Sequence, residues 1–408
     1  MALFLIKFAL YLNEQSFLLN KKPSHISEYT KIKKTDFIEG VLTPHKKTKK
    51  TVLKEIYKPK IDRVTPIIEK KPSKTYKALY KHQTNKFNSN ILDRPENWEI
   101  SVFQNIKKQD ILNKPVCKHK YTSPSNCRDP VSYIVKNENK NWLFAPYIKN
   151  LSKGYVGVGS DANYSYIAFA KSTWVWLFDF DMNIVNLHKL LRIFILQSEN
   201  PESFVDKFHY KNAKSSIELL GLFVRENDEK MELKRIFKNY RNALYKNYNL
   251  SLKQKGQGKE FGWLSNSSSY QYIRLLYTQK RIAILPGDML KENTMRSIAK
   301  VAKELGVVIR VYYPSNAENF WKFTKIYKEN IQSLPFDSES VIISTTGNHW
   351  HPKGYKGSYW HYVVRGALNF QKRLATGYDS IDRFLPLRRL SSTHKELSTV
   401  ELTNIEVD

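Results

Sequence analysis

The feature that most constrains this chain is the stretch Gly154–Asp181, which reads GYVGVGSDANYSYIAFAKSTWVWLFDFD. A short apolar run leads into Gly157 and Gly159, a helix-like segment follows, and a second apolar run ends at Asp179. Apolar runs without alternation are typical of parallel strands that are buried on both faces. The stretch therefore predicts a strand–helix–strand unit, the building block of a parallel sheet.

The same alternation of strand-like and helix-like segments continues from about residue 141 to 370. The further strands are expected in RIAILPGD, VVIRVYYPSN, SVIISTT and YWHYVVRG, the last two as a hairpin. We therefore expect an α/β fold with a Rossmann-like, mostly parallel sheet covered by helices. A polar helical stretch at about 200–262 separates the second strand from the third. It is expected to be a helical insertion, either a substrate-selecting cap or a structural elaboration.

The charge of the chain is large and uneven. The formal net charge is +29, and residues 1–95 hold 21 Lys and Arg against 8 Asp and Glu. Such a segment cannot bury enough apolar surface to offset the entropy of ordering it. We expect a basic, largely disordered arm over 1–95, a folded domain over 96–385 and a flexible tail over 386–408. The arm predicts contact with polyanions, and the alternative is a Lys-rich composition without such a partner.

The first residues, 1–12, are apolar apart from Lys7. They resemble the apolar region of a signal peptide but lack its charged start and its cleavage site. No segment reaches the roughly 18 apolar residues of a membrane-spanning helix, so none is predicted. A cytoplasmic location is favoured, and export or envelope association through residues 1–12 is the alternative. Cys117 and Cys127 would form a disulfide in an exported protein and remain free thiols in the cytosol.

The glycines carry the first chemical signal. GVGSDA, which begins at Gly157, fits the form G-x-G-x-x-A of the dinucleotide fingerprint. Glycine lets a ligand approach the backbone, and the start of the following helix offers free N–H groups. Asp179 ends the next strand, where an acid commonly takes ribose hydroxyls. The alternative is a tight glycine turn, followed by Asp181 or Asn183 as the cap of the next helix.

With these positions in order, Gly154–Asp181 resembles the start of class I S-adenosylmethionine-dependent methyltransferases. Asp179 matches the acid that ends their second strand, and Asp288 in RIAILPGDM matches an acid after the third, near the adenine. The loop YPSNAE, with Asn316 and Glu318, matches the polar loop that borders the substrate after the fourth strand. The resemblance covers about residues 141–365. The cofactor positions that it implies are Gly157, Gly159, Asp161, Asp179 and Asp288, with Asn316 and Glu318 on the acceptor side.

The pattern GVG…N, LFDFD…LH, PSNAE and LPFD is also similar to an uncharacterised bacterial branch of this superfamily. The chain departs from ordinary members because it lacks a third glycine, the acid before the loop and a short connection to the third strand. The resemblance therefore implies S-adenosylmethionine as the cofactor of a methyltransferase-like protein, active or inactive, with an unknown acceptor. Two alternatives stay open: an NAD-dependent oxidoreductase, and a non-catalytic protein that binds nucleic acid or an anionic surface. The oligomeric state is not indicated.

Three histidines cluster late, in NHWHPKGYKGSYWHY. His349 and His351 would share one face of a strand, and a reversal of the chain would bring His361 near them. Three imidazoles are a plausible set of zinc or iron ligands, which is the metal alternative. His361 is also a candidate general base, and a packed strand histidine is the structural interpretation.

Overall fold

The computed structural model describes residues 92–112 and 131–402, all of which belong to the unit spanning residues 73–408. Nearly all of the basic arm, both cysteines and the last six residues lie outside the described residues, and so do the predictions made for them. No helix within the described ranges is long and apolar enough to cross a membrane.

The strands and helices follow the predicted alternation closely. The strands are β1 (Gly154–Gly157), β2 (Trp174–Asp179), β3 (Ile282–Pro286), β4 (Ile309–Ser315), β5 (Val341–Thr346), β6 (His361–Gly366), β7 (Arg388–Leu390) and β8 (Leu397–Val400). The helices are α3 (Asn97–Gln104), α4 (Ala145–Ile148), α5 (Ala162–Ala170), α6 (Met182–Leu196), α7 (Pro201–Asp206), α8 (Ala213–Phe223), α9 (Asn227–Leu252), α10 (Gln257–Phe261), α11 (Ser267–Thr278), α12 (Asn293–Glu304), α13 (Lys325–Ser333) and α14 (Ala367–Ala375).

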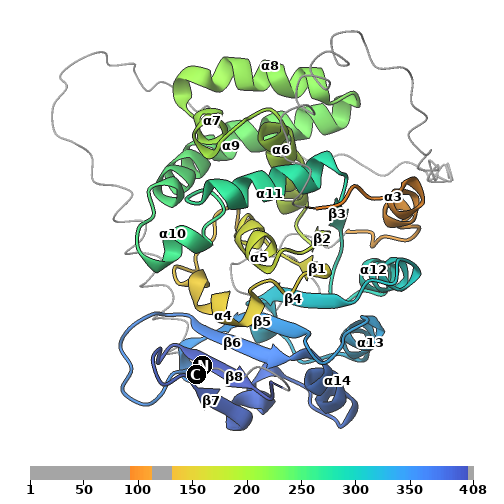
Figure 1. Ribbon diagram of the computed structural model, residues 1–408, viewed down its shortest axis with the longest axis vertical. Coiled ribbons are helices and arrows are strands. Elements are labelled where there is room, and N and C mark those ends of the chain that lie inside the picture. The colour runs from red at the N-terminus through yellow and green to blue at the C-terminus, as the bar shows by residue number, and fades with distance from the viewer. Residues whose placement is uncertain (1–91, 113–130, 403–408) are drawn as a thin grey trace, which may run out of the picture. The chain divides into compact units, whose positions relative to one another are not determined.

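All the strands join one sheet in the order β3-β2-β1-β4-β5-β6-β8-β7 (Figure 1). The first five strands in this order are parallel to one another. β6 is antiparallel to β5, as the predicted hairpin requires, β8 is parallel to β6, and β7 is antiparallel to β8. The predicted α/β class with a mostly parallel sheet is confirmed, and the order β3-β2-β1-β4-β5 matches the first five positions of the Rossmann order 3-2-1-4-5-6.

Helices cover both faces of the sheet. The side chains of each strand point alternately to the two faces and so contribute to both cores. In β2, Trp174, Trp176 and Phe178 face one core, to which α3, α12, α13 and α14 contribute. Val175 and Leu177 face the other core, under α4–α11. Figure 1 shows the first set of helices along one side of the sheet.

The predicted helical insertion is present as α7–α10, between α6 and α11. It packs on α6 through aromatic rings: Phe237 of α9 meets Phe194 with ring centres 5.7 Å apart. At the other end of the domain, the expected flexible tail from residue 386 is wrong, because β7 and β8 extend the sheet there. These strands are only three and four residues long, too short for an apolar pattern to reveal them.

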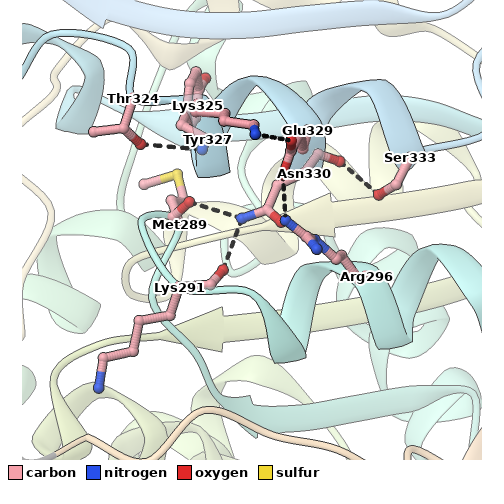
Figure 2. A network of polar contacts seen from close by, with 9 residues as sticks. All are labelled: Met289, Lys291, Arg296, Thr324, Lys325, Tyr327, Glu329, Asn330 and Ser333. Carbon is pink, nitrogen blue, oxygen red and sulfur yellow. Dashed lines mark hydrogen bonds and ion pairs between the residues drawn. The ribbon is translucent and has the colours of Figure 1, made fainter.

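The loop after β3 is held by Asn330 of α13, which is fully buried. Its Nδ2 donates to the carbonyls of Met289 and Lys291 at 2.9 and 2.8 Å, and its Oδ1 accepts from Arg296 Nε at 3.1 Å. Figure 2 shows this network between the loop, α12 and α13. One amide thereby fixes the position of the loop that carries Asp288.

Asn330→Ala is expected to lower the free energy of unfolding by about 3 kcal/mol, since two buried carbonyls and one guanidinium lose their partner. Urea unfolding followed by circular dichroism measures it. Lys325→Ala on the same helix is the control, because that side chain is 89% exposed. Equal stability of the two variants would contradict the assigned role.

Candidate functional site

The order of the strands identifies the point in the sheet where a ligand-binding crevice is expected. β1 lies between β2 and β4, and the chain leaves β1 toward one side and reaches β4 on the other. In open parallel sheets, ligands bind outside the carboxyl ends of the strands where the order reverses in this way. Gly157 is aligned with Leu177 of β2 and with Tyr313 of β4 at this point. The glycine loop, residues 157–161, therefore begins at the switch point.

Gly157 is required by packing inside the loop. A Cβ at this position would lie 2.1 Å from Asn163 Oδ1 and 2.6 Å from the Tyr155 ring. The Asn163 side chain crosses the loop, donating to the carbonyls of Val158 and Ser160 at 2.9 and 2.8 Å. Its Oδ1 accepts from the Tyr155 hydroxyl at 2.7 Å.

Gly159 is the part of the loop that opens outward. Its φ is +83°, and no heavy atom of the described residues lies within 4 Å of a Cβ built there. Its N–H donates to Asp179 Oδ2 at 2.9 Å, and its carbonyl lies 2.8 Å from His188 Nε2. Both backbone groups of this one residue are therefore fixed by buried side chains of β2 and α6.

The proton positions around His188 follow from this contact. A carbonyl only accepts, so Nε2 carries a proton and donates to Gly159. Burial lowers the pKa of His188 to about 4, so the ring is neutral and its Nδ1 accepts from the Tyr164 hydroxyl at 2.8 Å. The Tyr164 oxygen in turn accepts from Tyr277 at 2.8 Å. This buried chain of hydrogen bonds positions the carbonyl of Gly159.

Asp179 lies among other acids at the carboxyl ends of β2 and β3. Its Oδ1 accepts from the Asp181 N–H at 2.8 Å. Burial raises the pKa of Asp179 to about 7, and the charges of Asp181 and Asp288 add to the rise while the N–H donors oppose it. Asp181 also caps α6 by accepting from the Asn183 N–H at 2.9 Å, so the capping interpretation holds beside the fingerprint.

The backbone at Asp288 is held by Asp110, a residue that precedes the first strand of the sheet. The Asp288 N–H donates to Asp110 Oδ2 at 3.0 Å, and Asp110 Oδ1 accepts from the Asn293 N–H at 2.9 Å. The Asp288 carboxylate accepts from the Leu290 N–H at 2.9 Å. The loop after β3 thus directs Asp288 toward the same edge as Asp179.

Asp161 is the third acid of the site and is 1% exposed. Its Oδ2 accepts from Trp263 Nε1 at 3.1 Å, and its Oδ1 is buried without a hydrogen-bond partner in the part of the chain that the structure describes. Burial raises the pKa of Asp161, against the opposing effects of the Lys136 charge and the Trp263 and Ser160 donors.

A segment without helix or strand, residues 131–140, crosses this edge of the sheet, and we call it the strap. At one end Asn183, after β2, donates to Ser132 Oγ at 2.7 Å. At the other end the Lys140 N–H donates to the Tyr362 hydroxyl of β6 at 2.8 Å, and Lys140 Nζ pairs with Glu396. The strap therefore spans the carboxyl ends of the parallel strands from β2 to the start of β6.

Glu138 fixes the middle of the strap. Its Oε1 accepts from Tyr313 Oη at 3.0 Å, from Thr345 Oγ1 at 3.2 Å and from Ser315 Oγ at 3.4 Å. Burial raises the pKa of Glu138, and these donors with Lys136 oppose the rise. Ser315 has a φ of +56°, a left-handed backbone that is uncommon outside glycine and often found at functional sites.

Asn316 and Glu318, the two residues predicted on the acceptor side, lie in different surroundings. Asn316 follows Ser315 and is half-buried, and its carbonyl accepts from Asn319 Nδ2 at 2.8 Å. Glu318 is buried, and its carboxylate pairs with Arg365 and accepts from the Tyr327 hydroxyl. Asn316 thus lies near the crevice, while the Glu318 carboxylate belongs to an internal ion pair.

The late histidines separate into a pair and a single residue. The Nδ1 atoms of His351 and His361 lie 3.0 Å apart, and His361 Nε2 is 2.8 Å from Ser398 Oγ. His349 instead contacts Asp382 at 2.7 Å. Burial, with the charges of neighbouring basic groups, lowers the pKa of His361 to about 3. Within residues 92–112 and 131–402, no group of three His, Cys, Asp or Glu side chains is arranged to hold a metal ion.

The sequence analysis assigned no role to three residues of this site. Asn163 and His188 are the N and H of the quoted pattern GVG…N and LFDFD…LH, so a signal for both was present. Glu138 stands in an irregular segment before the first strand, where periodicity carries no information.

Alanine substitutions at Gly157 and Gly159 distinguish their two roles. Gly157 is required by packing inside the loop, and Gly159 by its left-handed backbone. Gly157→Ala is expected to cost about 3 kcal/mol, because the Cβ overlaps Asn163 and Tyr155. Gly159→Ala is expected to cost only about 1 kcal/mol, the penalty of a left-handed alanine in open space. Thermal and urea unfolding of the two variants give the comparison, and the reverse order of stability would refute it.

The raised pKa of Asp179 predicts a pH dependence. The folded state keeps a proton that the unfolded state releases above about pH 4, so this group lowers stability as pH rises toward 7. The slope is at most about 1.4 kcal/mol per pH unit. Asp179→Asn should remove it, so the stability of wild type relative to the variant should fall between pH 5 and 7.

Urea unfolding at pH 5, 6, 7 and 8 measures this difference. Asp206→Asn, an exposed acid on α7, should run parallel to wild type throughout. Parallel curves for Asp179→Asn as well would mean that Asp179 titrates at an ordinary pH.

Comparison with known proteins identifies the family of this chain. No curated protein matches the chain. One matching solved structure is the rRNA methyltransferase aviRa from Streptomyces viridochromogenes, at 13% identity over 73% of this chain and 99% of that chain. Its TM-score is 0.28, too low to support a conclusion about fold or activity. A family model described as "Domain of unknown function (DUF7790)" matches residues 133–401, more than half of the chain, from the strap to the end of the sheet. The chain therefore belongs to the DUF7790 family.

Proposed function

We propose that this chain binds S-adenosylmethionine at the carboxyl ends of β1, β2 and β3, as a methyltransferase-like protein. The observation that carries the proposal is the way the loop at Gly159 is held. Asp179 fixes its N–H and His188 fixes its carbonyl, while none of the residues that the structure describes fills the space beside its Cα. A backbone fixed from within and open on its outer side is suited to close contact with a ligand.

Asp179 has capacity for a ligand in addition to the loop. Each of its oxygens accepts one backbone N–H, from Gly159 or Asp181, and a carboxylate offers about four acceptor positions. The remaining positions suit two neighbouring hydroxyls, which is the pattern of a ribose diol. Asp288, whose charge acts on Asp179, extends the same acidic edge toward β3.

The charge of the site favours a cationic nucleoside over a dinucleotide. In dinucleotide sites the pyrophosphate lies at the start of the helix after the glycine loop. Here Asp161 occupies that position before α5, and its buried carboxylate would oppose a doubly anionic group. S-adenosylmethionine carries a sulfonium cation instead. NAD is thus the weaker of the two cofactors proposed from the sequence.

The acceptor side of the proposal lies beside β4 and β5. S-adenosylmethionine, when bound, supplies an already activated methyl group, so the protein has mainly to align an acceptor and exclude water. Ser315, Asn316 and Glu138 border the ends of these strands. Glu138 would accept the proton that an N–H or O–H acceptor releases.

Calorimetric titration of the full chain with S-adenosylmethionine, S-adenosylhomocysteine and NAD tests the proposal. We expect binding of the first two and none of NAD. Asp179→Ala should weaken binding about 10- to 100-fold, since hydrogen bonds to a charged group contribute roughly 1.5–3 kcal/mol.

Glu304→Ala is the matched control, because this acid lies at the exposed end of α12. Circular dichroism establishes that each variant is folded. Absence of heat with all three ligands in folded wild type would refute the proposal, and heat with NAD alone would favour the oxidoreductase.

A further inference from the structure

The second half of α9 and the segment that follows it carry an unbalanced positive charge. Residues 233–259 contain eight Lys and Arg and no Asp or Glu. Within the described residues, the ion pairs of α9 are Lys189–Glu229 and Arg235–Glu232, and both lie in its first turns. The cations after Arg235 thus form no ion pair with a described carboxylate, whereas most protein surfaces intersperse the two signs.

Four residues form a stripe along α9. Lys234, Lys238, Arg241 and Tyr245 follow one another at spacings of four, three and four, so they share one face of the helix. Like charges at such spacings repel one another. The helix dipole does not explain them, because its effect is confined to the last turn and Arg241 lies eleven residues before Leu252. The stripe costs free energy that a bound anion would offset.

An exposed tyrosine lies beside this stripe. Arg241 Nη1 donates to the Phe208 carbonyl at 2.9 Å, and the ring centres of His209 and Tyr245 are 5.1 Å apart. Tyr210 comes next in the chain, with its ring centre 4.5 Å from that of His209. Its side chain is 65% exposed. The segment before α8 therefore holds an aromatic ring in water next to the cations of α9.

Further cations surround this ring. Lys211 Nζ lies 6.0 Å from the centre of the Tyr210 ring, and residues 207–217 contain three lysines and no acid. Together with the stripe they form a surface of the insertion that we call the basic face: Lys207, Tyr210, Lys211, Lys214, Lys238 and Arg241.

The chemistry of the basic face indicates its partner. Cations that track a phosphate backbone, combined with an exposed ring on which a base can stack, are typical of surfaces that bind single-stranded nucleic acid. The bases of a duplex are already stacked on one another and are not available to Tyr210. An anionic bilayer would satisfy the cations but offers no flat ring to the tyrosine.

We propose that the basic face binds single-stranded nucleic acid, with its lysines on the phosphates and Tyr210 stacked on a base. These residues are separate from the glycine loop, so the inference does not depend on a cofactor. The face begins beside the candidate site, because Arg235, next to Lys234, donates to Asn183 Oδ1 at the start of α6 at 2.6 Å.

Fluorescence anisotropy of the full chain tests the phosphate contacts, with labelled oligouridylate and oligothymidylate of about 12 nucleotides. Lys211, Lys214 and Lys238 are all exposed, so their combined replacement by Gln should leave the fold intact. This triple variant should weaken binding about tenfold. It should also lower the slope of log affinity against log salt by about 2, since each phosphate contact to a single strand contributes about 0.7.

A second triple variant is the matched control. Lys300→Gln, Lys322→Gln and Lys325→Gln remove the same charge from side chains that are 69, 84 and 89% exposed, outside the insertion. It should change the affinity less than about twofold, because it removes no phosphate contact. The arm over residues 1–95 is present in both triple variants, so it cannot produce a difference between them.

The stacking role of Tyr210 has its own test. Tyr210→Ala should weaken both oligonucleotides about 5- to 150-fold, since stacking on a base is worth about 1–3 kcal/mol. It should leave binding to a duplex of the same length and to phosphatidylserine vesicles unchanged. Trp98→Ala on α3, where the side chain is 51% exposed, is the aromatic control and should have no effect.

Circular dichroism establishes that each variant is folded. Equal weakening by the two triple variants would mean that net charge alone is responsible, and would overturn the proposal. Unchanged oligonucleotide affinity in Tyr210→Ala would overturn it as well, and so would vesicle binding that depends on Tyr210. Failure of the chain to bind S-adenosylmethionine would refute the proposed function and leave the basic face standing.

Discussion

The candidate site depends on one hydrogen bond, from the Gly159 N–H to Asp179, at the carboxyl ends of two paired strands. It ties the loop after β1 to the end of β2, and the second oxygen of Asp179 ties in the start of α6 through Asp181. His188 of α6 then returns to the carbonyl of Gly159. The loop, β2 and α6 are therefore joined in one hydrogen-bond network. A ligand would meet a backbone that needs little reorganisation. Such preorganisation lowers the entropic cost of binding.

Two elements outside the Rossmann-like core contact the candidate site. Trp263, directly after the insertion, donates to Asp161, and the strap brings Glu138 onto β4 and β5. The end of the insertion is thus tied to the glycine loop by a buried hydrogen bond from Trp263. The strap and the insertion approach from different parts of the chain.

The sequence predicted the fold more fully than the site, for physical reasons. Long buried strands such as β2 and periodic helices such as α6 carry strong apolar patterns, whereas β7 and β8 are too short to do so. Gly157, Gly159 and Asp179 follow a local spacing that the chain displays. Glu138 meets Thr345 across more than two hundred residues, a contact that no local pattern encodes. Glu318 looked like an acceptor-side acid because its partner, Arg365, lies 47 residues away in sequence.

The two glycines also show how far a fingerprint can support a function. At Gly157 the missing side chain is explained by Asn163, which fills the space from within. At Gly159 nothing in the described protein fills the space, and the left-handed backbone alone explains the glycine. A chain that had lost its ligand would keep both glycines for these reasons. Unsatisfied buried groups are different, because they cost free energy in the absence of a partner. The Oδ1 atom of Asp161 is buried without a hydrogen-bond partner among the described residues, so the packing of the loop does not account for it as it accounts for the glycines.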